Sequence, residues 1–281
     1  MKSALSPTTA LLIGCLSVAP AAHAAASDAC PANVTAAVAK SAGIALKGGA
    51  VVASSTCRSW PHDRDKLLSA FAFGTAGEDE KLLVVAMVDA KTGQVVASHE
   101  SAVTEDAAVA FGERSLAIDT APYQLSGTVR AFGVRFNSDA RGASCADGSW
   151  GDELTLFIRE GHTLRPVLEG LAMTRAEARK GCFGNAAQEL VYDEAKLSVG
   201  LAKTSSHGFA DLIVSARISR EANEGSRTEP KVEPKVEPKV EPKVEPKVEP
   251  KVERYTLRYD GGAYRSGGKM PWWLAWFPPN G

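Results

Sequence analysis

Residues 145–153 come closest, by residue type and spacing, to a binding site in this chain. They hold Asp147, Trp150 and Asp152 beside two glycines. A glycine-rich acidic loop can present carboxylate oxygens to Ca²⁺, which takes about six to eight oxygen ligands. The Asp-x-Asp-x-Asp-Gly spacing of calcium loops is absent. We therefore expect a surface loop anchored by Cys145, with Asp147, Trp150 and Asp152 as candidate binding residues and no metal.

The same two carboxylates offer an alternative, because paired Asp or Glu residues can hydrolyse glycosidic bonds by acid/base catalysis. Other catalytic patterns are absent from the sequence: there is no His-x-x-x-His or His-Glu-x-x-His pair, no Gly-x-Ser-x-Gly elbow, no phosphate loop and no dinucleotide fingerprint. The histidines after residue 24 are isolated: His62, His99, His162 and His207. We therefore expect a protein without catalytic residues or cofactor, and keep a hydrolase using Asp147 and Asp152 as the alternative.

Residues 270–281 form an aromatic tail that contains Trp272, Trp273 and Trp276. An exposed apolar patch of this kind promotes aggregation, which favours a tail that folds back over a groove or a sheet edge. Two functional alternatives remain: the tryptophans anchor a partner protein, or they contact a membrane surface peripherally. The three tryptophans are thus candidate binding residues.

Four cysteines follow residue 24, and an even number in an exported chain indicates two disulfides. Four cysteines allow three pairings, and the order along the chain favours the two shortest loops, Cys30 with Cys57 and Cys145 with Cys182. Each bond would contribute about 3 kcal/mol in the loop-entropy model. No two cysteines lie close enough together for a zinc site.

The N-terminal segment is typical of a secretory signal peptide. Lys2 precedes an apolar run, and the small-residue pattern that ends at Ala24 predicts cleavage after residue 24. An alternative is a lipoprotein anchored at Cys15, since residues 12–15 resemble a lipobox. No other stretch is long and apolar enough to span a membrane. We therefore expect a periplasmic or secreted protein.

Residues 229–252 are six copies of Glu-Pro-Lys-Val. Proline at every fourth position excludes helix and central strand, and favours an extended, disordered segment. In composition alone this segment resembles the spacer of the energy-coupling protein TonB, whose membrane anchor and folded domain are arranged differently. We expect residues 25–228 and 253–281 to form one β-rich domain, with residues 229–252 as a dispensable loop between two neighbouring strands.

Alternating apolar and polar residues predict an all-β fold with three similar units, each a strand followed by a hairpin. The units cover residues 67–74 with 81–98, residues 129–138 with 153–170, and residues 210–219 with 254–265. Such repetition predicts an antiparallel meander arranged as a partial or small β-propeller. The alternative is a two-sheet β-sandwich.

The third unit carries a family resemblance. Residues 207–214, His-Gly-Phe-Ala-Asp-Leu-Ile-Val, and residues 259–264, Tyr-Asp-Gly-Gly-Ala-Tyr, resemble the blades of periplasmic FG-GAP-like or VCBS-like proteins. The Asp-rich calcium loop of many such blades is missing here. The resemblance implies a non-catalytic binding protein, since some of those proteins are inhibitors or immunity proteins against cell-wall-degrading enzymes.

Composition sets the remaining limits on function. The chain has 281 residues, of which 44% are hydrophobic, so it can bury a substantial core. With 32 Lys and Arg against 33 Asp and Glu, it lacks the excess of positive charge that nucleic-acid binding requires. We therefore expect a non-enzymatic binding protein of the bacterial envelope whose partner is another envelope protein, and no nucleic acid.

Overall fold

The computed structural model describes residues 29–46, 51–77, 79–223 and 249–274. The expected signal peptide, Cys15 and Trp276 lie outside these residues, as does most of the Glu-Pro-Lys-Val repeat. The described chain forms one helix, α1 (Ala32–Ser41), a short 3₁₀ turn, η1 (Trp272–Leu274), and a sheet of twelve strands. The strands are β1 (Val52–Ser59), β2 (Lys66–Gly74), β3 (Glu80–Asp89), β4 (Val95–Thr104), β5 (Leu116–Gln124), β6 (Arg130–Phe136), β7 (Gly148–Glu160), β8 (Thr163–Lys180), β9 (Leu190–Ser206), β10 (Phe209–Asn223), β11 (Lys251–Tyr259) and β12 (Tyr264–Ser266).

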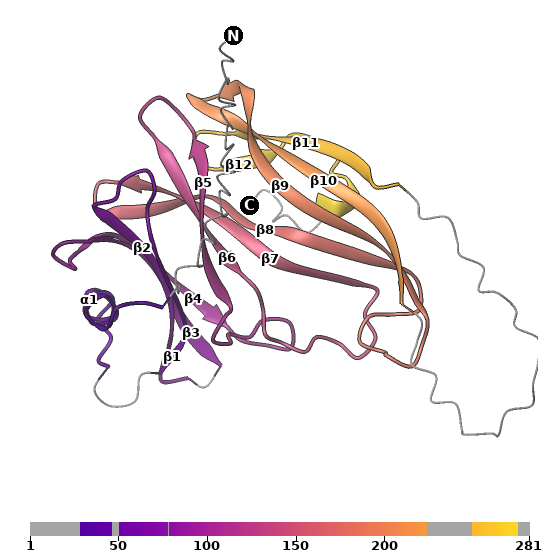
Figure 1. The fold of residues 1–281 in the computed structure, drawn as a ribbon, viewed down its shortest axis with the longest axis horizontal. Helices are drawn as coiled ribbons and strands as arrows, with labels where there is room; N and C mark the ends of the chain where they lie inside the picture. The colour runs from indigo at the N-terminus through magenta and orange to yellow at the C-terminus, as the bar shows by residue number, and fades with distance from the viewer. Residues whose placement is uncertain (1–28, 47–50, 78, 224–248, 275–281) are drawn as a thin grey trace, which may run out of the picture.

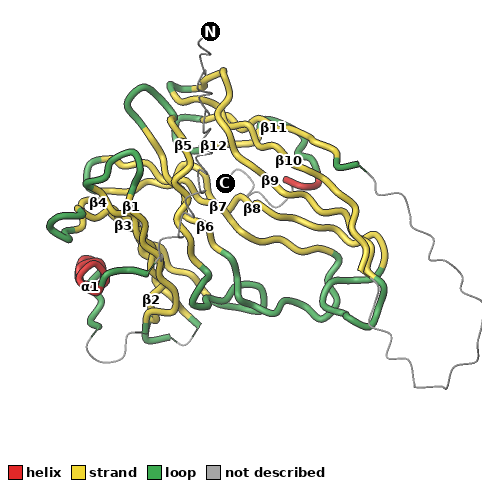
Figure 2. Tube along the Cα trace, in the orientation of Figure 1, coloured by secondary structure: helices red, strands yellow, loops and turns green. Residues whose placement is uncertain are grey.

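The sheet consists of two antiparallel meanders (Figures 1 and 2). Strands β1 to β4 pair in sequence order, and strands β5 to β12 do the same. The two meanders join where Ser98 of β4 pairs in parallel with Thr163 of β8. Within the described residues no helix is long and apolar enough to cross a membrane.

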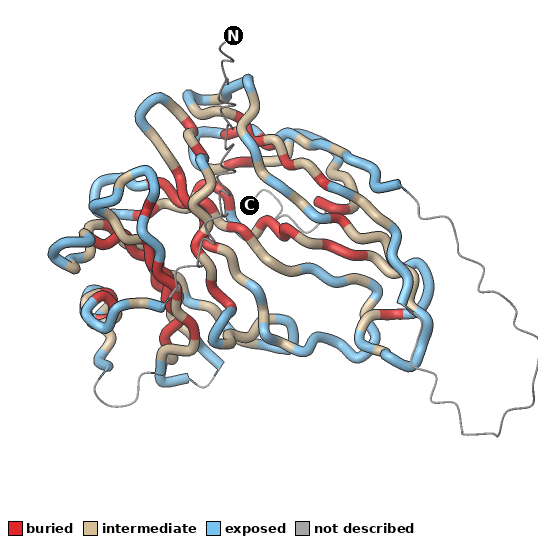
Figure 3. Tube along the Cα trace, in the orientation of Figure 1, coloured by how far each residue is buried: buried red, intermediate tan, exposed pale blue. Residues whose placement is uncertain are grey.

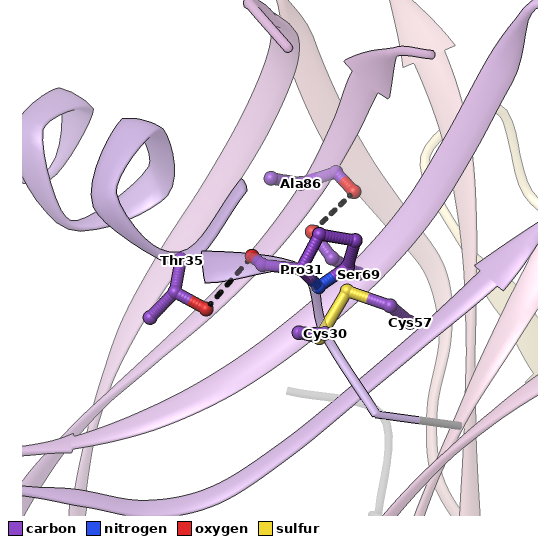
Figure 4. The surroundings of a disulfide bond; sticks show 6 residues. All are labelled: Cys30, Pro31, Thr35, Cys57, Ser69 and Ala86. Atoms are coloured by element: carbon purple, nitrogen blue, oxygen red, sulfur yellow. Dashed lines mark hydrogen bonds between the residues drawn. A yellow bond between two sulfur atoms is a disulfide. The ribbon is translucent and has the colours of Figure 1, made fainter. Parts of the chain in front are cut away.

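The near-continuous apolar run of β3 is explained by burial on both faces of the first meander. Val84 and Ala86 belong to a cluster with Val34 and Val38 of α1, which covers the outer face. Met87 belongs to a second cluster, between β1–β4 and β5–β7. Helix α1 was not predicted from the sequence. A disulfide between Cys30 and Cys57 ties its start to β1 (Figure 4).

The second meander curves around the largest core cluster (Figure 3). Its inner face is formed by the alternate residues that the sequence pattern predicts, such as Leu212, Val214 and Ala216 of β10. On β11, Leu257 and Tyr259 are buried, whereas Arg258 between them is exposed. The period of two residues therefore determines which face of these strands points into the core.

The all-β antiparallel meander is confirmed, and each expected unit is a run of three consecutive antiparallel strands. The units are not separate propeller blades, because hydrogen bonds join β4, β8, β9 and β10 within the same sheet. The propeller-like arrangement is therefore wrong. The face-to-face packing of the sandwich alternative occurs between β1–β4 and β5–β7.

Strand β11 pairs with β10, as expected for the strands on either side of the repeat. It begins at Lys251, and Val252 pairs with Arg217. The last two residues of the sixth repeat copy are therefore strand, which corrects the expected boundary of the loop at residue 252. Both disulfides have the favoured pairing, Cys30 with Cys57 and Cys145 with Cys182.

Candidate functional site

A crevice lies between the two meanders, close to the point where they join. Beside the Ser98–Thr163 pair, the amide of Ser98 donates a hydrogen bond to the carbonyl of His162 at 3.2 Å. An inner cavity of about 260 Å³ lies between β3 and β4 on one side and β6, β7 and β8 on the other. The isolated parallel contact thus leaves room between β4 and the second meander.

The inner cavity has mostly apolar walls. They include Leu83 and Val85 from the first meander and Val134, Phe136 and Phe157 from the second. The polar lining residues are His99, Ser101, Glu153, Thr155 and Glu169. The His99 ring lies 5.4 Å from the Phe157 ring, measured between centroids. Such a space suits an apolar group with a few polar contacts at its edge.

An outer cavity of about 400 Å³ adjoins the inner one. Val109, Phe136 and Glu153 line both, so the two cavities are adjacent, and we refer to the pair as the crevice. Trp150 and Phe183 add two aromatic side chains to the outer cavity, and Trp150 is 42% exposed. Together the two volumes fall within the range of small-molecule sites, about 300 to 1,000 Å³.

Glu153 is the carboxylate shared by the two cavities. Burial raises the pKa of Glu153, because the ionised form is costly in an apolar setting, and a hydrogen bond from Trp150 partly opposes this effect. Among the described residues, no Lys, Arg or His lies within salt-bridge distance of Glu153. Glu153 therefore brings an acidic group into the crevice without a neutralising cation.

The start of β7, with Trp150, is held in place by backbone contacts and by the second disulfide. Cys145 is bonded to Cys182, and Ala146 and Phe183 exchange two backbone hydrogen bonds of 3.0 and 2.9 Å. Gly184 has a φ of +88°, and a Cβ there would lie 2.6 Å from the carbonyl oxygen of Ala143. The turn therefore requires glycine, and one wall of the outer cavity is covalently fixed.

Asp152 serves a structural role. Its φ of 55° lies in the left-handed region, and its carboxylate forms an ion pair with Arg135. Arg135 also binds Asp119, with its Nη2 2.9 Å from Oδ2, and Tyr123 donates a hydrogen bond to the same oxygen at 3.2 Å. Burial and Asp119 together hold the pKa of Tyr123 far above its usual value. Asp152 thus belongs to a partly exposed ion-pair network with Arg135 and Asp119.

The structure separates the two aspartates that the sequence placed in one loop. Asp147 lines another hollow, of about 420 Å³, together with Arg175 and Glu177. Trp150 lines both this hollow and the outer cavity. The expected loop therefore contributes Trp150 to the crevice, whereas Asp152 is engaged by Arg135. Among the described residues, no group of three or more His, Cys, Asp or Glu side chains is placed to hold a metal ion.

The aromatic tail folds back in its described part. Trp273 is 1% exposed, lies in the core of the second meander, and donates a hydrogen bond from Nε1 to Oε2 of Glu253 at 2.8 Å. Trp272 is partly buried against the same core. Trp273 is therefore not available as a surface anchor in this structure, which corrects its assignment as a candidate binding residue.

Sequence reasoning missed Glu153, Phe136 and Phe183 as lining residues. Glu153 directly follows the loop residues that were singled out, but its burial depends on strands distant in sequence.

Comparison with protein-family models, with curated proteins and with solved structures finds no match for this chain. The crevice is thus the feature on which a functional proposal can be built.

Proposed function

We propose that this protein is a non-catalytic binding protein of the bacterial envelope that holds its ligand in the crevice between the two meanders. The observation that carries the proposal is the adjacency of the two cavities, which share Val109, Phe136 and Glu153, with Trp150 exposed in the outer one. Two disulfides fit an oxidising compartment, which supports an envelope location. The ion pair of Asp152 with Arg135 argues against Asp152 as a hydrolytic acid or base.

The first test uses a neutral apolar fluorophore, N-phenyl-1-naphthylamine, which brightens when it leaves water. We expect saturable binding of one fluorophore per chain. Ser101→Trp fills the inner cavity and should abolish this binding. Ser198→Trp, on an exposed position of β9, is the matched control and should bind as the wild type does. Unchanged binding to Ser101→Trp would overturn the proposed site.

The second test concerns catalysis and the partner. Purified protein is incubated with cell-wall material, and we expect no soluble products. Product release that is lost in Asp147→Asn would instead support the envelope hydrolase. If the protein is an inhibitor or immunity protein, its ligand is part of a cell-wall-degrading enzyme, and the wild type should inhibit that enzyme. Trp150→Ala should then inhibit the enzyme at least tenfold more weakly than the wild type does.

A further inference from the structure

The charges in the crevice are uneven. Two carboxylates, Glu153 and Glu169, line it, against one permanent cation, Arg141, which is exposed beside the outer cavity. Glu153 lines both cavities, whereas Arg141 lines the outer one alone. The junction of the cavities is therefore acidic.

Burial raises the pKa of Glu153, which means that its ionised form is understabilised in the free protein. A ligand with a positive charge at this position would supply the missing counter-charge. An anionic ligand such as a fatty acid would instead place a second carboxylate beside Glu153, which costs energy in a partly buried site. The charge of the site thus selects for a cation over an anion.

Aromatic side chains strengthen this preference. Phe136, Trp150 and Phe183 line the outer cavity together with Glu153. Aromatic faces attract ammonium groups when the two are within about 6 Å, and tryptophan does so best. Because Trp150 also donates a hydrogen bond to Glu153, its ring is held close to the carboxylate. Aromatic rings are the groups that proteins use to bind quaternary ammonium ligands, and a carboxylate beside them supplies the opposite charge that favours a cation.

The inner cavity limits the rest of the ligand. An apolar protein cavity of about 150 Å³ holds one benzene molecule. The inner cavity, at about 260 Å³, therefore has room for a chain of about eight carbons. The walls formed by Val134, Phe136 and Phe157 would cover such a chain.

We propose that the crevice binds an alkylammonium ligand, with its ammonium group at Glu153 among the aromatic rings and its alkyl chain in the inner cavity. This inference rests on the proposed function, because it names the class of ligand for the same crevice. If the inference is correct, Glu153 distinguishes ligands by the charge of their head group. The inner cavity should then bind the alkyl chain equally well for each head group.

The experiment displaces the bound N-phenyl-1-naphthylamine with three compounds of equal chain length: octylammonium, 1-octanol and octanoate. We expect octylammonium to displace the fluorophore at a concentration at least tenfold below that of octanoate, with 1-octanol between them. Glu153→Gln should weaken octylammonium about tenfold and leave 1-octanol unchanged. Glu100→Gln removes the same charge from an exposed position of β4 outside the crevice and should leave all three unchanged.

The outcomes separate the two proposals. If the fluorophore binds but 1-octanol or octanoate displaces it as well as octylammonium does, the crevice is a binding site and the alkylammonium inference is wrong. If Glu153→Gln weakens all three compounds equally, Glu153 supports the structure and does not recognise charge, which also overturns the inference. Failure of the fluorophore to bind the wild type overturns the proposed function itself.

Discussion

Removal of the Trp273 side chain tests whether the C-terminal segment is part of the core. Trp273 is 1% exposed and belongs to the same cluster as Leu257 and Tyr264. A buried tryptophan removes about 150 to 250 Å² from water. At about 25 cal/mol per Å² this corresponds to about 4 to 6 kcal/mol. Residual burial in the unfolded chain lowers the figure, so we expect Trp273→Ala to cost about 3 to 5 kcal/mol.

Trp273→Phe separates the contribution of packing to this loss of unfolding free energy from the contribution of the hydrogen bond. Phenylalanine keeps most of the aromatic contact but cannot donate a hydrogen bond to Glu253, whose side chain is 31% exposed. Because Glu253 remains partly hydrated, the lost hydrogen bond should cost about 1 kcal/mol. The free energy of unfolding of Trp273→Phe should therefore lie between those of the wild type and Trp273→Ala.

The assay is urea unfolding followed by far-ultraviolet circular dichroism. Trp150→Ala is the matched control, because Trp150 is 42% exposed and its removal should cost less than about 1 kcal/mol. The melting temperature should fall by about 2 to 4 °C for each kcal/mol lost. A loss for Trp273→Ala no larger than that of the Trp150→Ala control would refute the conclusion that the segment is a core element.

Three further predictions concern other parts of the chain. Replacing residues 224–248 with an eight-residue Gly/Ser linker should raise the free energy of unfolding by up to about 1 kcal/mol, because the entropic cost of closing a loop grows with the logarithm of its length. A fall in melting temperature would show instead that the segment stabilises the fold. Replacing both Cys145 and Cys182 with serine should cost about 3 to 4 kcal/mol, because the bond closes a loop with a sequence separation of 37 residues, and should weaken fluorophore binding. Equal stability with and without reductant would contradict this. Hydrogen bonds from Thr92 lower the pKa of Asp89 from 3.8 to about 2. The ionised form of Asp89 therefore stabilises the fold above about pH 4, and this contribution is lost as the pH falls toward 2. Asp89→Asn should flatten the dependence of unfolding free energy on pH over that interval, and an unchanged slope would contradict this role of Asp89.

The sequence was sufficient for features that depend on neighbours along the chain. The alternation in residues 210–219 and 254–259 predicted which side chains of β10 and β11 are buried, because side chains of a strand point alternately to its two faces. The order of the cysteines also predicted the correct pairs, because each pair lies in one local region of the fold.

Other features required the tertiary structure. The predicted propeller was wrong because the units are hydrogen-bonded to one another, as Ser98 is to His162. The alternation of apolar and polar residues in a strand indicates its buried face but not the strand with which it pairs. The role of Asp152 was decided by Arg135, which lies on the neighbouring strand β6. Helix α1 was missed because its Val34 and Val38 form only a short apolar stripe, which gains its stability by covering β3.

The same distinction applies to the crevice. The sequence identified the loop with Trp150, but it could not show that Glu153 would be partly buried against strands from both meanders. Burial of a carboxylate depends on which surfaces meet across the fold, and here β3 and β4 meet β6, β7 and β8, which begin 26 or more residues further along the chain, from Thr104 at the end of β4 to Arg130 at the start of β6. Local pattern therefore determined the strands and their faces, whereas the long-range contact between the two meanders determined the cavity and the electrostatic environment of Glu153.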